Sequence, residues 1–252
     1  MARILVISNR KGGSGKSSTS VNVAAELAAR RQRVLVIDLD SQGHCALGLG
    51  VKLERQAPTV HGFLAGRHDL RPALTHTAWP DLDLIAADPL FEHGMATDRE
   101  TMLRDALCAE GLHEAYDTIV LDTPPSLDGL LMNALCAADR VLVPFVPHFL
   151  SGEGVRQLAR VLFKVASKGL NEHLKVLGFL PVMVDLRIGQ HREVSASLSH
   201  QFGAARVLPG IRTDIKVAEA FAAGKPVRWY APSSRASTDY AAAVQALETL
   251  WA

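Results

Sequence analysis

The sequence predicts an α/β fold, a doubly wound and mostly parallel sheet with helices on both faces. Short apolar runs alternate along the chain with longer stretches rich in alanine and leucine. A parallel strand that is covered on both faces has such a continuous apolar run, and a helix connects it to the next strand. The chain has 252 residues, a size that one large α/β domain reaches, so we expect residues 1–252 to form a single domain.

The expected strands follow one another in a regular order. The first covers residues 4–7 and is followed by a helix expected over residues 16–30. Further strands are expected over residues 34–37, 82–85, 118–121, 140–143 and 176–180. Residues 51–104 are richer in proline and histidine, and we expect surface helices and loops there around one edge strand. In such a sheet, ligands bind at the carboxyl ends of the strands.

Composition narrows the class of protein. The formal net charge is +1, so the chain as a whole is neither strongly basic nor strongly acidic. The three cysteines form no C-x-x-C pair, and we expect them to be reduced thiols. No run of about 18 apolar residues and no signal peptide is present, so we expect a cytoplasmic protein without a membrane partner.

A glycine-rich loop lies between the first strand and the first helix. Its glycines let backbone N–H groups turn toward anionic oxygens, and the helix N-terminus adds partial positive charge. Lys16 is expected to reach the β- and γ-phosphates of a nucleotide, and the Ser17 hydroxyl is expected to bind Mg²⁺. The pattern G-x-x-x-x-G-K-[ST] fails at its first position, where Arg10 stands. The residues expected to bind the nucleotide are Lys11, Gly12, Gly13, Ser14, Gly15, Lys16, Ser17 and Ser18.

Acidic residues follow two other expected strands. Asp38 and Asp40 end the strand at residues 34–37, and alternation places both on the same side of an extended chain. Asp122 ends the strand at residues 118–121, where a carboxylate can hold Mg²⁺ or one of its waters. Paired acids also occur in solvated turns, and an apolar run ending in aspartate is common. Together with the glycine loop, these residues predict a phosphate and metal site.

These motifs resemble those of the ParA/MinD family of deviant Walker A ATPases, and the resemblance runs nearly end to end. Residues 11–17 are similar to its K-G-G-x-G-K-[ST] signature, and residues 38–43 to its D-x-D-P-Q-G element. Residues 121–127, with the sequence L-D-T-P-P-S-L, are similar to the Walker B region of the ParA branch. Residues 218–220, 224–226 and 234–236 also match segments of ParA-type chains.

The resemblance implies a P-loop NTPase that binds ATP and Mg²⁺ and forms an ATP-sandwich homodimer. In such a dimer Lys11 reaches the phosphates of the partner's nucleotide, a role that an arginine finger has in other NTPases. Asp40 orients or activates the attacking water, and Asp38, Asp122 and Ser17 support Mg²⁺. The catalytic residues are then Lys11, Lys16 and Asp40. Hydrolysis is slow and resets the dimer.

Some positions depart from the family pattern. Arg10 replaces the usual glutamine, Ser14 the usual valine, Ser41 the usual proline and His44 the usual asparagine. None of these changes removes a group needed for hydrolysis. Arg10 and His44 are the positions where the dimer surface or partner contacts are expected to differ.

Other branches of the family are excluded by single positions. Gly129 stands where the nitrogenase iron-protein branch has a cluster cysteine, and no late C-x-x-C of the iron–sulfur carriers exists. Residues 240–252 contain no lysine or arginine, whereas MinD-type proteins carry a basic membrane-binding helix. The ParA branch instead binds non-specific DNA. Residues 186–252 contain eight basic residues against five acidic ones, and the candidate DNA contacts are Arg187, Arg212, Lys216, Lys225, Arg228 and Arg235.

Two functions remain open at this point. The first is a nucleoid-associated ATPase that positions a cargo, such as a plasmid, a chromosome origin, a chemoreceptor cluster or a carboxysome, through an adaptor protein that stimulates hydrolysis. The second is a regulatory switch whose ATP-bound dimer controls another protein without using DNA. The residues alone do not separate them.

Overall fold

The computed structural model describes residues 1–91, 99–148 and 151–251. Within them, a seven-stranded sheet has the strand order β3-β4-β2-β5-β1-β6-β7. Neighbouring strands pair in parallel, except that β3 is antiparallel to β4. The strands are β1 (Arg3–Ile7), β2 (Val34–Asp38), β3 (Leu74–His76), β4 (Leu82–Ile85), β5 (Thr118–Asp122), β6 (Arg140–Phe145) and β7 (Lys175–Pro181). The predicted α/β fold with a mostly parallel sheet is confirmed.

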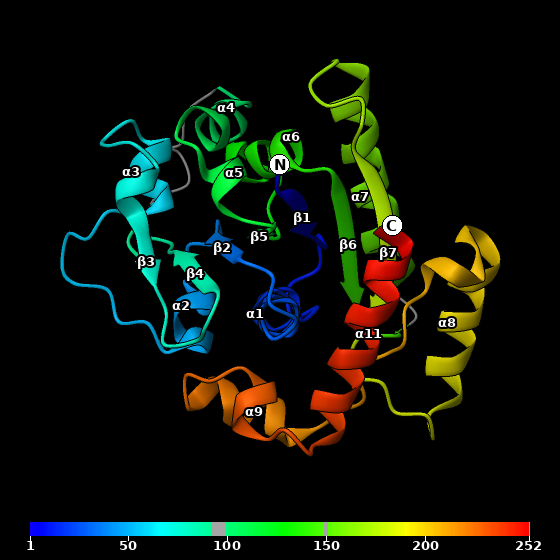
Figure 1. Ribbon diagram of the computed structural model, residues 1–252. Helices are drawn as coiled ribbons and strands as arrows, with labels where there is room; N and C mark the ends of the chain where they lie inside the picture. The colour runs from blue at the N-terminus through cyan, green and yellow to red at the C-terminus, as the bar shows by residue number, and fades with distance from the viewer. Residues whose placement is uncertain (92–98, 149–150, 252) are drawn as a thin grey trace.

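Helices cover both faces of this sheet (Figure 1). One layer contains α3 (Val60–Leu64), α4 (Met102–Ala109), α5 (Leu112–Ala115), α6 (Gly129–Ala137) and α7 (Ser151–Ser167). The opposite layer contains α1 (Lys16–Ala28), α2 (His44–Leu49), α9 (Ile215–Ala222), α10 (Val227–Tyr230) and α11 (Arg235–Trp251). Beyond β7 stand α8 (Gly189–Phe202) and the short 3₁₀ helix η3 (Ala204–Arg206), and a second 3₁₀ helix, η1 (Arg71–Ala73), precedes β3.

The alternation of side chains along each strand produces two hydrophobic cores. In β1, Ile4 and Val6 belong to the core under α6, whereas Leu5 and Ile7 belong to the core under α1. All four side chains are at most 1% exposed. Since each strand is buried on both faces, its sequence has no polar alternation, which explains the continuous apolar runs.

The expected strands are all present, but the expectation of one edge strand within residues 51–104 was wrong. The described part of this region contains two strands, and β4 lies inside the sheet between β2 and β3. The edge is β3, which has only three residues, all half-buried or exposed. So short a segment carries no apolar run, and the sequence pattern therefore did not indicate it. The first helix ends at Ala28 rather than at residue 30.

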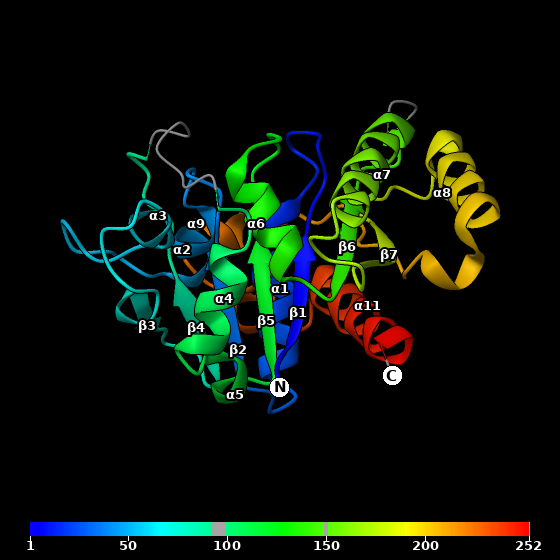
Figure 2. The ribbon, with the colours of Figure 1, turned by 90° about the horizontal axis from the view of Figure 1, so that it is seen from above.

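The carboxyl ends of the three central strands meet at one edge of the sheet. Asp122 of β5 stands beside Ile7 of β1 on one side and beside Asp38 of β2 on the other. The loop that follows β1 lies at the end of the sheet opposite the N-terminus (Figure 2). Among the described residues, no helix is long and apolar enough to cross a membrane.

Candidate nucleotide-binding site

The loop between β1 and α1 is shaped by two glycines. Gly13 and Gly15 have φ angles of 68° and 77°, a left-handed conformation that glycine adopts without steric strain. Gly15 lies directly before α1, where a Cβ atom would come within 3.2 Å of Val182. Since glycine has no side chain to cap the first amides of α1, these amides remain available to an anion.

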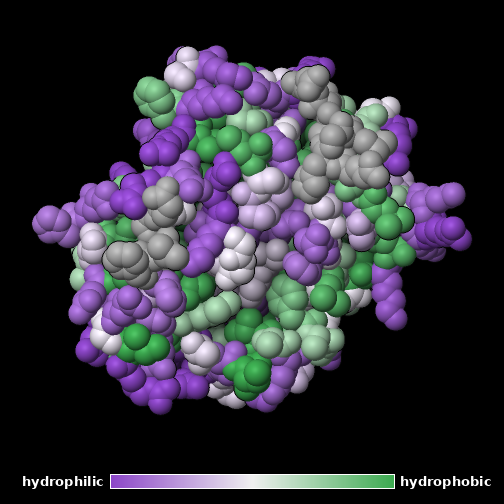
Figure 3. Space-filling view, turned by 180° about the vertical axis from the view of Figure 1, so that it is seen from behind, coloured by the Kyte–Doolittle hydropathy of each residue, from purple (hydrophilic) through white to green (hydrophobic). Residues whose placement is uncertain are grey.

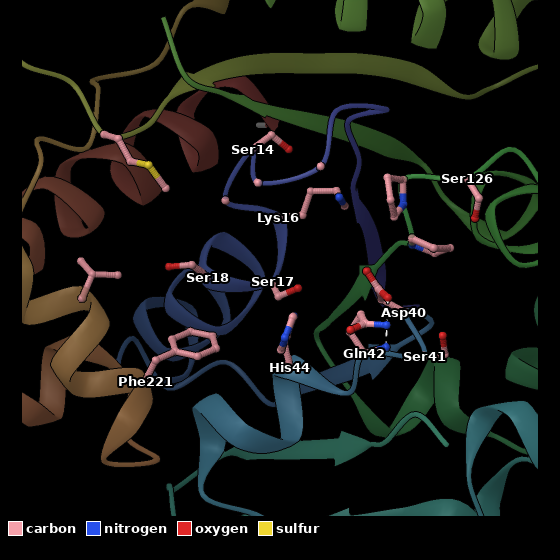
Figure 4. Close-up of a pocket in the computed structure, with 17 residues that line it drawn as sticks. Ser14, Lys16, Ser17, Ser18, Asp40, Ser41, Gln42, His44, Ser126 and Phe221 are labelled. Atoms are coloured by element: carbon pink, nitrogen blue, oxygen red, sulfur yellow. Dashed lines mark hydrogen bonds between the residues drawn. The ribbon is translucent and has the colours of Figure 1, made fainter. Parts of the chain in front are cut away.

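A pocket of about 720 Å³ opens beside this loop (Figure 4), a size suited to a small-molecule ligand. Every residue expected to bind the nucleotide lines it, with the exception of Lys11. The other walls come from the loops after β2, β5 and β7 and from α9. The full lining comprises Gly12, Gly13, Ser14, Gly15, Lys16, Ser17, Ser18, Asp40, Ser41, Gln42, His44, Pro124, Pro125, Ser126, Met183, Val217 and Phe221.

Lys16 extends into this pocket from the first turn of α1 (Figure 4). The residue is only 7% exposed. Burial lowers the pKa of Lys16, and the carboxylates of Asp122 and Asp40 act in the opposite direction. A cation in this position, with an open cavity in front of it, is suited to bind phosphate oxygens.

Asp38 and Asp122 lie directly opposite each other on β2 and β5, and both are completely buried. Asp38 accepts hydrogen bonds from the backbone N–H groups of Cys45, at 2.9 Å, and Asp40, at 3.1 Å. Burial raises the pKa of both carboxyl groups. The charge of Asp122 raises the pKa of Asp38 further, whereas hydrogen bonds from Ser17 and Ser20 lower that of Asp122. Neither of the two carboxyl groups belongs to the lining of the pocket.

Sequence reasoning missed the thiol of Cys45 beside these carboxylates. The Cys45 Sγ–H group donates to Asp122 Oδ2 over 3.5 Å. One ligand atom from each of Cys45, Asp38 and Asp122 lies within 4.8 Å of the others. The turn after β2 leads into α2 and thereby places the Cys45 thiol beside the ends of β2 and β5. The sequence carries no signal of that turn beyond Gly43, which has a φ angle of 65°.

Asp40 is the acidic residue of this group that reaches the pocket. It is 8% exposed, and its Oδ1 accepts a hydrogen bond from the N–H of Gln42 at 3.1 Å. The loop that carries it is also closed by a bond from the N–H of Gly43 to the carbonyl of Asp40, at 2.9 Å. Asp40 and Lys16 approach the pocket from different elements (Figure 4).

Lys11 is exposed and stands at the start of the loop, outside the lining of the pocket. Its backbone N–H donates to Asn9 Oδ1 at 3.0 Å, and Asn9 Nδ2 in turn donates to the carbonyl of Pro144 at 2.8 Å. Asn9 is 2% exposed, so it ties the loop firmly to the end of β6. Since Lys11 is exposed, its side chain remains accessible to a second protein chain.

Part of the pocket lining was not predicted. Met183, Val217 and Phe221 belong to it, and Phe221 lies near Ser18 on the side away from Asp40 in Figure 4. Met183 has a φ angle of 53°, which is uncommon for a residue with a side chain. The three come from α9 and the segment after β7, which carry no phosphate motif.

The donor set near the loop fits Mg²⁺. Ser17 lines the pocket and its hydroxyl donates a hydrogen bond to Asp122, which lies opposite Asp38 on the neighbouring strand. Hydroxyl and carboxylate oxygens are the hard ligands that Mg²⁺ prefers. The Ser14 Oγ atom is buried without a hydrogen-bond partner among the described residues, as expected for a loop built to meet a ligand.

Three of the predicted DNA contacts come together and three do not. Arg187, Arg212 and Arg235 line one hollow of about 560 Å³. Lys216 pairs with Glu219 at 2.7 Å, and Arg228 pairs at 2.8 Å with Glu26, which is 1% exposed.

Several of these cations are already neutralised. Arg187 pairs with Asp185 at 2.7 Å, and Arg212 pairs with Asp239 at 2.8 Å. Within the described ranges, Arg235 and Lys225 make no ion pair. Among the described residues, the hollow therefore contains one arginine without an ion pair, whose charge still lowers the pKa of Asp214, and two arginines that are paired with carboxylates.

A strand, a glycine loop with an inward lysine, and a helix, with an aspartate on the neighbouring strand, define a P-loop nucleotide-binding protein. The family model AAA_31, described as an AAA domain, matches residues 2–176. The chromosome partitioning protein ParA of Caulobacter vibrioides is 37% identical over 233 residues, which cover 90% of this chain and 87% of that protein. The chain belongs to the ParA/MinD family of deviant Walker A ATPases, in its ParA branch.

Two further proteins are similar to this chain over nearly its whole length. The chromosome-partitioning ATPase Soj of Thermus thermophilus is 37% identical over 247 residues, 94% of this chain and 92% of that protein. The structure of cobyrinic acid a,c-diamide synthase from Mycobacterium smegmatis with bound ADP and magnesium is 30% identical and has a TM-score of 0.80. That match covers 100% of this chain and 96% of the synthase.

Proposed function

We propose that this chain is a ParA-type ATPase that forms an ATP-sandwich dimer, binds non-specific nucleoid DNA and positions or segregates a cargo through an adaptor that stimulates hydrolysis. The observation that carries the proposal is the position of Lys11. Gly12 to Ser18 line the pocket of their own chain, whereas Lys11 is exposed beside it. Partitioning proteins such as ParA of Caulobacter vibrioides and Soj of Thermus thermophilus support the cellular role.

Nucleotide binding follows from the loop and α1. Backbone amides of Gly12 to Ser17 surround the phosphates, and the Lys16 ammonium neutralises part of their charge. Ser17, with Asp38 and Asp122, would hold Mg²⁺, which when bound shields the phosphates and orients them. The apolar side chains of Met183, Val217 and Phe221 offer a surface for the base.

Hydrolysis requires a water beside the terminal phosphate. Asp40 is the carboxylate in the pocket wall, and it would orient that water and accept its proton. Lys11 of the second protomer would then neutralise the charge that develops on the transferred phosphoryl group. Since this lysine comes from the partner, hydrolysis depends on dimer formation.

The dimer is tested by size-exclusion chromatography with Mg²⁺ and either ATP or ADP. We expect the wild type to elute as a dimer with ATP and as a monomer with ADP. Lys11→Ala is expected to remain monomeric with ATP while its pocket still binds the nucleotide, and Lys52→Ala, at another exposed lysine, is the control. A Lys11→Ala protein that dimerises like the wild type would contradict the role of Lys11.

A further inference from the structure

A histidine outside the pocket connects the loop that carries Asp40 to the segment that follows β4. His61 lies in α3 and is 0% exposed. Its Nε2 atom lies 3.2 Å from the carbonyl oxygen of Leu39, the residue directly before Asp40. Its Nδ1 atom accepts a hydrogen bond from the backbone N–H of Asp88 at 2.9 Å.

These two contacts determine the proton positions on the ring. The Asp88 N–H group donates, so Nδ1 carries no proton. In the neutral ring the proton then lies on Nε2, which donates it to the Leu39 carbonyl. The ring is also stacked on Phe91, with centroids 4.4 Å apart and planes 8° from parallel. His61 therefore has little freedom to turn.

The Leu39 peptide is held from both of its ends. On one side, the N–H of Leu39 donates to the carbonyl of Asp122 at 2.9 Å. On the other, the N–H of Asp40 donates to Asp38 Oδ1 at 3.1 Å. His61 provides the contact to the carbonyl between them. We propose that His61 is a positioning residue for hydrolysis, whose Nε2–H group holds the Leu39 carbonyl and thereby fixes the Asp40 carboxylate in the pocket.

The inference rests on the proposed role of Asp40. A carboxylate that orients water must be held within a fraction of an ångström, and a misplaced group lowers the rate steeply. Nucleotide binding depends instead on Lys16 and on the backbone amides of the glycine loop. The two hydrogen bonds of His61 described above join it to Leu39 and Asp88 rather than to that loop. Loss of the Leu39 contact should therefore lower kcat and leave ATP affinity nearly unchanged.

Three substitutions separate the two hydrogen bonds. In His61→Gln the side-chain amide can occupy the Nε2 position and still donate to Leu39. In His61→Asn the amide oxygen can occupy the Nδ1 position and still accept from Asp88. His61→Phe keeps a ring to stack on Phe91 and loses both bonds. We expect His61→Asn and His61→Phe to lower kcat roughly ten-fold and His61→Gln to keep it within about two-fold of the wild type.

The measurements are single-turnover ATP hydrolysis with Mg²⁺, binding of a fluorescent ATP analogue, and thermal unfolding. His68→Phe is the matched control, because His68 lies on the same segment as His61. Its Nε2 atom accepts a hydrogen bond from the N–H of Thr59 at 3.4 Å, and Thr59 is not part of the loop that carries Asp40. It should leave kcat unchanged.

The inference is overturned if His61→Asn retains activity while His61→Gln loses it, or if kcat, ATP affinity and unfolding temperature fall together in all His61 variants. The latter result would assign His61 a purely structural role. A wild-type protein that hydrolyses no ATP would instead contradict the proposed function, so the two failures are distinguishable.

Discussion

Asp38 and Asp122 form a pair of buried carboxyl groups that the folded protein holds face to face across β2 and β5. Lys16 is the cation whose charge lowers the pKa of Asp122, and burial outweighs it. Both pKa values are raised, so ionisation of either carboxyl group lowers the stability of the folded state. Such a site favours a bound cation, and the free protein should reveal the unfavourable charge in its pH dependence.

We predict that Asp122→Asn stabilises the nucleotide-free protein by roughly 1 kcal/mol at pH 7, about 2–4 °C in Tm. The folded pKa of Asp122 lies above its unfolded value, so the folded state holds more protons in the window between them. Raising the pH through that window therefore lowers the free energy of unfolding of the wild type, and the variant should lose part of this dependence.

Thermal unfolding from about pH 4, near the unfolded pKa of an aspartate, to pH 8 measures the effect. Asp117→Asn is the control, because hydrogen bonds from Arg33 lower the pKa of this exposed carboxyl group. Asp117 stabilises the folded state above its unfolded pKa, so its removal should have the opposite sign. A wild type and an Asp122→Asn variant with parallel pH profiles would contradict our account of the buried pair.

A second prediction at this scale separates binding from hydrolysis. Lys16→Ala should bind ATP at least 100-fold more weakly, because the buried ammonium meets the phosphates directly. Asp40→Ala should keep ATP binding and lose hydrolysis, so that an ATP-bound dimer accumulates. Nucleotide-binding titrations and chromatography of the ATP complex measure both. Normal turnover by Asp40→Ala would show that another group orients the water.

At the scale of elements, the start of α1 is the part whose conformation matters most to the ligand. We predict that Gly15→Ala destabilises the protein by about 1 kcal/mol through its left-handed φ angle and also weakens ATP binding more than ten-fold. Gly66→Ala is the matched control, since Gly66 has a φ angle of 71° and an added Cβ atom there would have no neighbour within 4 Å. Equal ATP affinities of the two variants would contradict a special role for the loop.

The elements differ in how well the sequence predicts them. Strands such as β1 and β5 are apolar on both faces, and this pattern is visible in a single sequence. The edge strand β3 is too short to show a pattern. The glycine loop, Asp40 and Asp122 were predictable because they follow strands directly. Met183, Phe221, Cys45 and His61 were not, because only tertiary packing brings their segments to the strand ends.

At the scale of the whole molecule, hydrophobic side chains occupy separate patches among hydrophilic ones on the face in Figure 3. The basic hollow of Arg187, Arg212 and Arg235 is a candidate for the DNA-facing side. Two protomers together would present it twice. Two basic patches on one dimer bind a polyanion more tightly than one patch does, without any new kind of contact. Once the first patch is bound, the second binds the same molecule intramolecularly.

We predict ATP-dependent binding to duplex DNA of any sequence, weakening as salt rises. Arg235→Ala should weaken binding several-fold and reduce the salt dependence, because this arginine has no ion pair among the described residues. Lys225→Ala is the control for the position of the charge, because Lys225 also makes no ion pair among the described residues but does not line the hollow. Gel shifts with ATP, with ADP and without nucleotide measure binding. Absence of ATP-dependent binding at low salt would favour the alternative, a switch that controls a protein partner without DNA.

The pocket draws its walls from segments spread along nearly the whole sequence, from Gly12 to Phe221. Ser18, at its rim, also lies 3.4 Å from the hydroxyl of Tyr240 in α11, measured between the two side-chain oxygens. A chain still being synthesised on the ribosome has its glycine loop early but lacks these later walls for many seconds, at about 5–20 residues per second. The nascent protein therefore cannot complete its pocket until α9 has been synthesised.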